Sequence, residues 1–508
     1  MTTLSEINPH ANVFTQTGAL RFALGMALSA LSGIMLLLAF PPYGVWPLAW
    51  VALVPYLFAQ YRLIPLRWSS LAAATANLLW LGPFMARLFG ANMGPFFQYL
   101  GVWLAILSFF LSRERKFHEL TQFRWFILSG VLAWVGFEMI RATFIPLVAT
   151  SAFIGYTQAA QAWLIQPVSV FSVYGLNLVI MLVNFTLAQS VMVWADKHWI
   201  AAGVPAINTR STWRWLALAG GVTAAWVCLS LAQYFSTPQD APTVRVAALT
   251  PNFPREAHND KETPVEVRVS TFAEMARQAA QQGAQIIYTA EMIFAFDPQV
   301  EYTEELKAVA RETGAYLFLT YVISQEGQPW RNEAIMLSPS GEFSEVYGKN
   351  HVIGEPPTMM SGVYPVFETP LGRLASLICH DANYTDVTRK LARNGAQLIA
   401  TPFNEFGGFG EQLWTNVVFR AVESGAAMVI SGAKTVSGIV EGNGRVVELE
   451  INLGGKRQVV VGDVHLGRAN TLYLILGDWM GWICLGGFVF FMVFQMVTEN
   501  KAKKADRA

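Results

Sequence analysis

The sequence predicts a helical membrane bundle that carries one soluble α/β domain, and three observations support this fold class. The 508 residues are 53% hydrophobic and only 14% charged, which is too apolar for an ordinary soluble enzyme. Long apolar runs fill the first half of the chain and return near its C-terminus. Between them, short β-rich runs alternate with helical ones. We therefore divide the chain into a membrane domain (1–239), a soluble domain (240–468) and a C-terminal membrane helix with a basic tail (469–508).

The apolar runs are the candidate membrane helices. A helix needs about 20 apolar residues to cross a bilayer. About eight runs approach this length: 19–40, 46–60, 70–90, 95–112, 124–146, 168–195, 213–235 and 470–496.

The basic residues between these runs predict the orientation of the chain. They cluster in alternate loops and in the tail, as Arg62 and Arg67; Arg113, Arg115, Lys116 and Arg124; Lys197, Arg210 and Arg214; Lys501, Lys503, Lys504 and Arg507. The other loops, at 41–45, 91–94 and 147–167, carry almost no positive charge. Because short cytoplasmic loops are enriched in Lys and Arg, both termini are predicted to be cytoplasmic and residues 240–468 extracytoplasmic.

The soluble segment reads as an α/β domain with largely buried strands. Its β-like runs are 244–250, 284–291, 316–323, 333–342, 373–380, 396–403 and 427–434, and its helical runs are 264–283, 303–314, 385–395 and 414–425. Turn-like sequences at 338–341 and 441–444 indicate that some strand pairs are antiparallel.

The few cysteines and the balanced charge exclude several classes of function. Three cysteines are too few and too scattered for a disulfide framework or a zinc site, and two of them, Cys228 and Cys484, lie within apolar runs. Lys plus Arg equals Asp plus Glu at 35 each, so the net charge gives no indication of a nucleic-acid partner. Only Cys379 is left for chemistry.

Three reactive residue types stand at or just after the ends of β-like runs. Glu291 ends the run 284–291, Lys349 is the last residue of the EVYGK run (345–349), and Cys379 lies near the end of 373–380. Because catalytic groups of open α/β sheets gather outside the carboxyl ends of strands, these side chains are predicted to meet in one pocket. Cys379 would be the nucleophile, Glu291 the general base, and Lys349 the charge facing the developing oxyanion. A buried structural thiol and a structural ion pair are the alternatives.

The motifs around these residues resemble a known family. The order Glu, Lys, Cys, with YGKNH at 347–351 and LICHD at 377–381, is similar to the carbon-nitrogen hydrolase (nitrilase) superfamily. A domain of this kind between seven membrane helices and one more resembles the apolipoprotein N-acyltransferase family. The runs LAFPPYGVWPLAWVALVP (38–55) and VSVFSVYGLNLVIMLVN (168–184) resemble the membrane helices of that family.

The resemblance implies a fold, a reaction and partners. The soluble domain would be a nitrilase-like αββα sandwich at the outer face of a bacterial inner (plasma) membrane. A phospholipid would donate a fatty acyl chain to the thiol, and a lipoprotein amine would accept it, with no cofactor and no metal. Glu355 resembles the family's second glutamate and Asn404 lies in a loop resembling the one beside the nucleophile, while Asp381 would assist by its position.

The chain also departs from the family pattern. His380 and Asp381 follow the cysteine where Tyr-Glu is usual, and the segment between Glu355 and Cys379 is short. We expect no Cys379–His380 dyad, because successive residues of a strand point to opposite faces. Two alternatives to the acyltransferase stay open: a membrane-tethered amidase of the nitrilase kind, and a catalytically silent binding protein.

Overall fold

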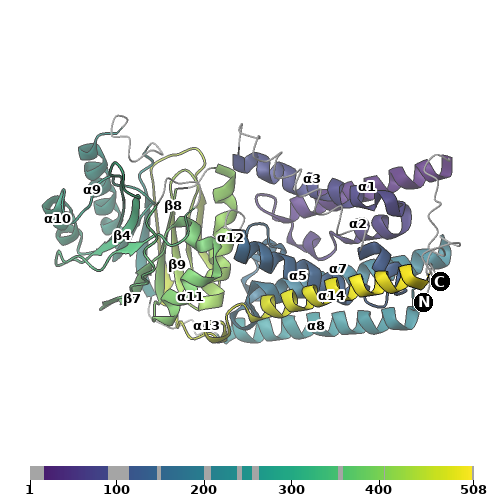
Figure 1. Cartoon of the computed structure of the whole chain (residues 1–508). Helices are drawn as coiled ribbons and strands as arrows, with labels where there is room; N and C mark the ends of the chain where they lie inside the picture. The colour runs from purple at the N-terminus through teal and green to yellow at the C-terminus, as the bar shows by residue number, and fades with distance from the viewer. Residues whose placement is uncertain are drawn as a thin grey trace.

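The computed structural model describes residues 16–89, 114–145, 150–199, 207–236, 243–253, 263–352, 358–404 and 407–505. The molecule is elongated, with a bundle of long helices at one end and a sandwich of two β-sheets at the other (Figure 1).

The bundle is apolar along its length. Its long helices are α1 (Gln16–Ala39), α3 (Ser69–Phe89), α5 (Phe126–Phe144), α7 (Val168–His198), α8 (Thr209–Phe235) and α14 (Trp479–Ala505). Within the described residues, five stretches are long and apolar enough to cross a membrane: Gly18–Ala39, Phe126–Phe144, Val168–His198, Thr209–Phe235 and Trp479–Ala505.

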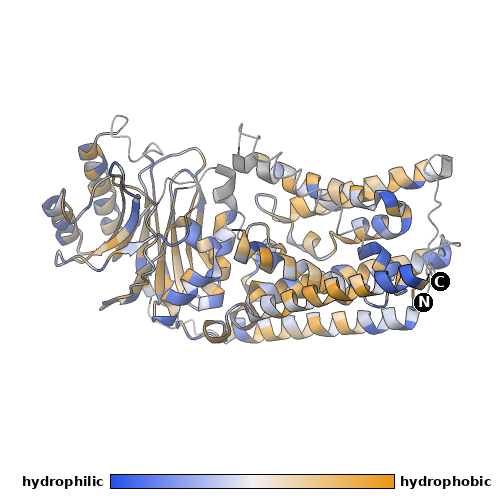
Figure 2. Ribbon diagram, in the orientation of Figure 1, coloured by the Kyte–Doolittle hydropathy of each residue, from blue (hydrophilic) through white to orange (hydrophobic). Residues whose placement is uncertain are grey.

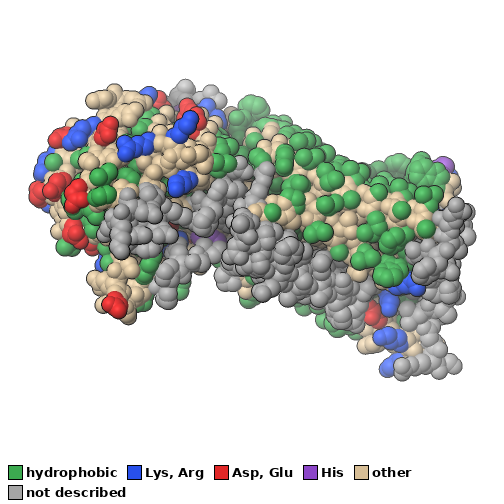
Figure 3. All heavy atoms as spheres, turned by 90° about the horizontal axis from the view of Figure 1, so that it is seen from above, with side chains coloured by type: hydrophobic (Ala, Val, Ile, Leu, Met, Phe, Trp, Pro, Cys, Tyr) green, Lys and Arg blue, Asp and Glu red, His purple; other side chains and the backbone are tan. Residues whose placement is uncertain are grey.

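The surface of the bundle matches a lipid environment. Outward-facing apolar side chains such as Leu218, Phe490 and Val493 are at least half exposed. Hydrophobic residues run along the bundle helices, whereas charged side chains gather on the sandwich and at the far end of the bundle (Figures 2 and 3). Exposing so much apolar surface to water is unfavourable, and burial in a bilayer removes that cost.

The predicted span at 46–60 is not one helix. The chain there forms short helical pieces, η1 (Trp46–Trp50), α2 (Val54–Phe58), η2 (Ala59–Leu63) and η3 (Leu66–Trp68). Pro47 and Pro55 lie in the first turns of η1 and α2, where proline starts a helix because it has no N–H to donate. Asn184 of α7 accepts the N–H of Leu53 and donates to the carbonyl of Ala49, both at 2.9 Å. The irregular backbone is therefore satisfied inside the bundle.

Two further spans are predicted at 95–112 and 470–496. The run at 95–112 lies outside the described residues, and the C-terminal span begins at Trp479, after the short helix α13 (Leu472–Leu476).

Three of the basic loops and the C-terminal tail gather at one end of the bundle. Arg115 donates to the backbone carbonyl of Ile64 at 2.6 Å, and Arg62 pairs with Asp196 at 2.7 Å. Leu120 packs with Ala502 of α14. The sandwich lies at the opposite end (Figure 1).

The soluble domain is a sandwich of two six-stranded sheets. The first has the order β12-β1-β2-β3-β4-β5 and the second β11-β10-β9-β8-β7-β6. The strands are β1 (Thr243–Thr250), β2 (Ile286–Thr289), β3 (Tyr316–Ile323), β4 (Arg331–Leu337), β5 (Tyr347–Gly348), β6 (Phe367–Thr369), β7 (Gly372–Ser376), β8 (Leu398–Phe403), β9 (Ala427–Gly432), β10 (Val436–Val440), β11 (Val446–Ile451) and β12 (Gln458–His465).

Helices cover both outer faces of the sandwich. Helices α9 (Val265–Gln281) and α10 (Thr303–Thr313) lie on the first sheet, and α11 (Thr385–Arg393) and α12 (Gly407–Ser424) on the second (Figure 1). Alternation along β1 separates two cores: Val246 and Ala248 pack between the sheets, whereas Ala247 and Leu249 pack under α9. This αββα layering confirms the α/β prediction.

The bundle and the sandwich share a buried joint. Helix α12 packs against α7, where Ser172 leaves the helical conformation (φ 54°, ψ 179°). Glu423 of α12 accepts the N–H of Val173 at 2.8 Å and pairs with Arg420 at 2.6 Å. Both charged side chains are 1% exposed. The break in α7 therefore places a free backbone donor where α12 can bind it.

Candidate active site

The three predicted catalytic residues follow three strands. Glu291 comes two residues after β2, Lys349 directly after β5, and Cys379 three residues after β7. β3 is parallel to β2, and two antiparallel steps, from β3 to β4 and from β4 to β5, restore that direction at β5. β2 and β5 therefore point the same way, and Glu291 and Lys349 lie at one edge of the first sheet.

Glu291 and Lys349 form a buried ion pair. Lys349 Nζ lies 3.0 Å from Glu291 Oε1, and the two side chains are 1% and 2% exposed. Asn332 of β4 donates its side-chain N–H to the same carboxylate oxygen at 2.8 Å, and its carbonyl accepts the N–H of Lys349 at 2.9 Å. Asn332 was not predicted from the sequence, although a polar residue beside the apolar EAIML run is a usable signal. Asn332 therefore binds both members of the ion pair and fixes their relative position.

Cys379 stands at a strained turn. Strand β7 ends at Ser376, not at His380 as predicted, and Cys379 opens the short 3₁₀ helix η5 (Cys379–Asn383) with a φ of 51°. A non-glycine residue in this left-handed region costs about 1–3 kcal/mol and persists only where its surroundings hold it. Cys379 is 2% exposed. The argument from alternating strand faces therefore does not apply to His380.

Asp381 joins the Lys349 loop to the Cys379 turn. Its fully buried carboxylate accepts hydrogen bonds from the Tyr347 hydroxyl at 2.6 Å and from the backbone N–H groups of His351 at 2.7 Å, Asn350 at 3.1 Å and Ile378 at 3.1 Å. All four partners are donors, which suits an ionised carboxylate. Burial raises the pKa of Asp381, while the Tyr347 hydroxyl and the Lys349 charge act against that rise.

A second set of contacts surrounds His380. Its Nδ1 accepts from the Asn383 side chain at 2.8 Å, and its ring meets the edge of Tyr384 with the centroids 5.3 Å apart. Tyr384 stacks on His351 at 3.6 Å, and His351 Nε2 lies 2.8 Å from Asp386. Burial opposes ionisation of Asp386, but its hydrogen bonds to His351 and Lys390 lower its pKa to about 2.

The remaining predicted site residues are placed as follows. Asn404 directly follows β8 and is partly buried. Because β7 and β8 are parallel neighbours, it lies at the same edge of the second sheet as the Cys379 turn. Glu355 lies outside the described residues. In the part of the chain that the structure describes, no group of three or more His, Cys, Asp or Glu side chains could hold a metal ion.

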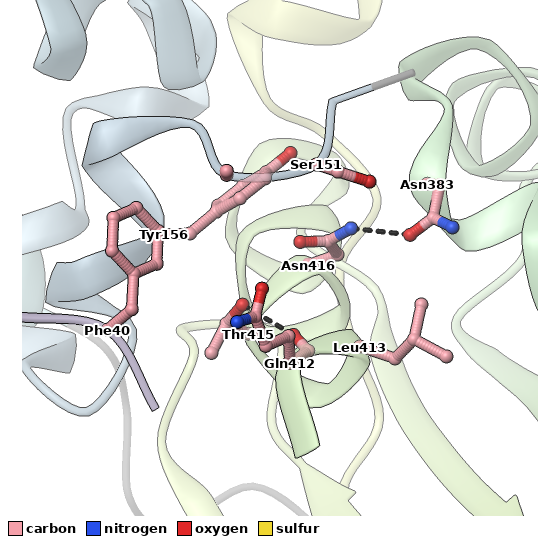
Figure 4. Close-up of a pocket in the computed structure, with 9 residues that line it drawn as sticks. Phe40, Ser151, Tyr156, Asn383, Gln412, Leu413, Thr415 and Asn416 are labelled. Atoms are coloured by element: carbon pink, nitrogen blue, oxygen red, sulfur yellow. Dashed lines mark hydrogen bonds between the residues drawn. The ribbon is translucent and has the colours of Figure 1, made fainter. Parts of the chain in front are cut away.

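A narrow pocket lies where the sandwich meets the membrane bundle, and Asn383, at the end of the Cys379 turn, is one of the residues that line it (Figure 4). The bundle contributes Phe40, Ser151, Ala152 and Tyr156, and the sandwich contributes Asn383, Gln412, Leu413, Thr415 and Asn416. The polar groups that line the pocket are uncharged amides and hydroxyls.

Comparison with known proteins identifies two successive family matches. The carbon-nitrogen hydrolase family model matches residues 245–454, and the model of the apolipoprotein N-acyltransferase N-terminal domain matches residues 32–186.

Three relatives illustrate the range of similarity. The chain is 25% identical to the apolipoprotein N-acyltransferase of Geobacter metallireducens, over 91% of this chain and 93% of the relative. It is 26% identical to that of Gloeobacter violaceus, over 90% and 92%. A variant of the amidase from Nesterenkonia sp. AN1, solved with a covalent adduct at its active-site cysteine, is 20% identical over 47% of this chain and 95% of its own, with a TM-score of 0.39. The two successive family matches and the relatives that match over about nine tenths of their length show that this chain belongs to the apolipoprotein N-acyltransferase family, within the nitrilase superfamily of carbon-nitrogen hydrolases.

Proposed function

We propose that this chain is an apolipoprotein N-acyltransferase that moves a fatty acyl chain from a membrane phospholipid to the N-terminal amine of a diacylated lipoprotein. The observation that carries the proposal is the buried Glu291–Lys349 pair, which Asp381 joins to the Cys379 turn in a domain seated on an apolar bundle. Relatives matched over about nine tenths of their length carry the name apolipoprotein N-acyltransferase, which supports transfer of an acyl group to the amine of a lipoprotein.

In the first step, Cys379 Sγ attacks the ester carbonyl of the phospholipid. Glu291 takes the thiol proton and returns it to the departing oxygen, so that a thioester and a lysophospholipid are formed. Lys349 faces the oxyanion that develops on the carbonyl oxygen. In a site with side chains only 1–2% exposed, such a charge acts with little screening by water.

In the second step, the lipoprotein amine attacks the thioester carbonyl. The C–S bond breaks, the amide forms, and the amine proton passes through Glu291 to regenerate the thiol. Neither step requires a metal ion or a nucleotide. Glu355 and Asn404 are proposed to support the site, as in the family motifs that they resemble.

The proposed placement follows from the bundle. Residues 1–239 and 469–508 would form the membrane part, with both termini in the cytoplasm, and residues 240–468 the extracytoplasmic catalytic part. The gathering of the basic loops at the end of the bundle remote from the sandwich supports this orientation.

Intact-protein mass spectrometry tests the first half-reaction. The purified chain is incubated with phospholipid and no acceptor, beside Cys379→Ala. We expect a hydroxylamine-labile fatty-acyl adduct on the native protein and none on the variant. Addition of a diacylated lipopeptide should then discharge the adduct and raise the mass of the peptide by one acyl chain.

A membrane-tethered amidase is the second candidate, because the carbon-nitrogen hydrolase match spans all three proposed catalytic residues. It predicts acid and ammonia or amine from a soluble amide, and no adduct from phospholipid. A catalytically silent protein would give neither product, and Cys379→Ser would not alter its behaviour.

A further inference from the structure

Asn383 links the nucleophile turn to two other parts of the molecule. It closes η5, is fully buried, and donates its side-chain N–H to His380 Nδ1 at 2.8 Å. Its side-chain oxygen accepts from Asn416 of α12 at 2.5 Å, and its backbone carbonyl accepts from the Thr150 hydroxyl at 2.6 Å. Thr150 belongs to the segment between α5 and α7 of the bundle.

The turn needs such external support because of its conformation. Cys379 has a φ of 51°, which only its surroundings can maintain. Asp381 holds the start of the turn through contacts within the sandwich, including the N–H of Ile378. Asn383 holds its end, through α12 and through the membrane bundle. The nucleophile therefore sits between one anchor in its own domain and one that crosses the domain joint.

The bundle side of this contact is itself anchored. Arg141 of α5 donates to the carbonyl of Ser151, next to Thr150, at 2.9 Å. Figure 4 shows Ser151 and Tyr156 of the bundle facing Asn383 and Asn416 of the sandwich across the narrow pocket. Helix α5 is thus connected to the Cys379 turn through two consecutive residues of the loop that follows it.

We propose that Thr150 and Asn416 are positioning residues that set the geometry of Cys379 through Asn383, so that the membrane bundle takes part in holding the nucleophile ready for acyl transfer. The inference rests on the proposed function, because it assigns these residues to the acylation step. It applies to the full chain, in which the sandwich is docked on the bundle.

An isosteric pair of variants at Thr150 tests the proposal. Thr150→Val removes the hydroxyl and keeps the shape, whereas Thr150→Ser keeps the hydroxyl. Thr415→Val is the matched control, because Thr415 lines the same pocket but its hydroxyl donates to the Gln412 carbonyl within its own helix. The rate and the final amount of the Cys379 acyl adduct are measured for each protein at saturating phospholipid.

We expect Thr150→Val to form the adduct roughly tenfold more slowly, with an unchanged final amount, because a small displacement of the reacting atom is costly. Asn416→Leu should behave similarly, and Thr150→Ser and Thr415→Val should match the native protein. Equal rates for Thr150→Val and Thr415→Val would overturn the proposal. So would a reduced final amount with an unchanged rate per active molecule, since that indicates a folding defect.

A second measurement separates this inference from the proposed function. If the native chain forms no acyl adduct, the acyltransferase assignment fails, and alkylation of Cys379 by iodoacetamide is followed by peptide mass spectrometry instead. A changed alkylation rate in Thr150→Val, but not in Thr415→Val, still supports positioning of the thiol. Identical alkylation rates reject it.

Discussion

Asp381 Oδ1 accepts the backbone N–H of His351 at 2.7 Å, across the gap between the two sheets of the sandwich. Asp381 belongs to the turn that presents Cys379, and His351 to the loop that presents Lys349. Because its other oxygen accepts the N–H of Ile378, one carboxylate fixes the relative position of both loops.

Asp381→Asn should therefore impair both folding and acylation. The amide nitrogen would face backbone N–H donors, so at least one buried donor would lose its partner, at a cost of about 2–3 kcal/mol. Thermal unfolding in detergent and the rate of adduct formation would report the two effects. Asp463→Asn is the control, since Asp463 pairs with Arg245 on the surface and both side chains are over 40% exposed. A native-like melting temperature for Asp381→Asn would contradict the linking role.

The Glu291–Lys349 pair allows stability and activity to be separated. Lys349→Met alone should destabilise the fold by about 3–5 kcal/mol, because it leaves a buried carboxylate unpaired. Glu291→Gln combined with Lys349→Met should recover most of that stability, because no uncompensated charge is left. Both the single and the double variant should fail to form the acyl adduct. Calorimetry and intact mass would show this pattern, whereas an active double variant would remove both residues from the proposed mechanism.

Glu423 should make stability depend on pH. Burial raises its pKa from 4.5 to about 7, although Arg420 acts to lower it. The folded state therefore holds this proton more tightly than the unfolded state does. The stabilisation that the protonated Glu423 carboxyl gives the folded state is fully present below pH 4.5. It is lost as the pH rises to about 7, and the total loss in unfolding free energy is about 3 kcal/mol.

Glu423→Gln should abolish this component. Between pH 4.5 and pH 8, the unfolding free energy of the native protein should fall relative to that of the variant. Chemical unfolding in detergent measures both free energies. A pH-independent difference would show that Glu423 ionises alike in both states. Glu312→Gln, at an exposed ion pair with Arg277, serves as the control.

The orientation can be tested by cysteine labelling in a Cys228→Ala background. Val300, which is 76% exposed on the sandwich, and Lys503, near the end of α14, are replaced by cysteine one at a time. A membrane-impermeant maleimide applied to intact spheroplasts should label only Val300→Cys, and disrupted membranes should allow both to react. Labelling of Lys503→Cys in intact spheroplasts would reverse the proposed topology.

Local patterns were sufficient for much of the fold. The β-like runs at 244–250 and 316–323 match β1 and β3 within one residue, and the turn at 441–444 joins the antiparallel strands β10 and β11. These elements were predictable because buried strands are short, apolar runs bounded by turn residues. Strands β10, β11 and β12 themselves were not predicted. β11 lies at the edge of its sheet with mostly exposed or partly exposed residues, so it lacks the buried apolar pattern.

The two-part architecture, the family and the three residues proposed for catalysis could be predicted from the amino-acid sequence, because apolar runs and short motifs are local properties of the chain. The contacts that surround those residues could not be predicted in this way, because they depend on tertiary packing. Asn383 forms hydrogen bonds with Asn416, 33 positions away in the sequence, and with Thr150, 233 positions away. Asn184 accepts the backbone N–H of Leu53, 131 positions away. No spacing rule connects such distant residues. They meet because packing of the sandwich on the bundle leaves buried polar groups that must find partners.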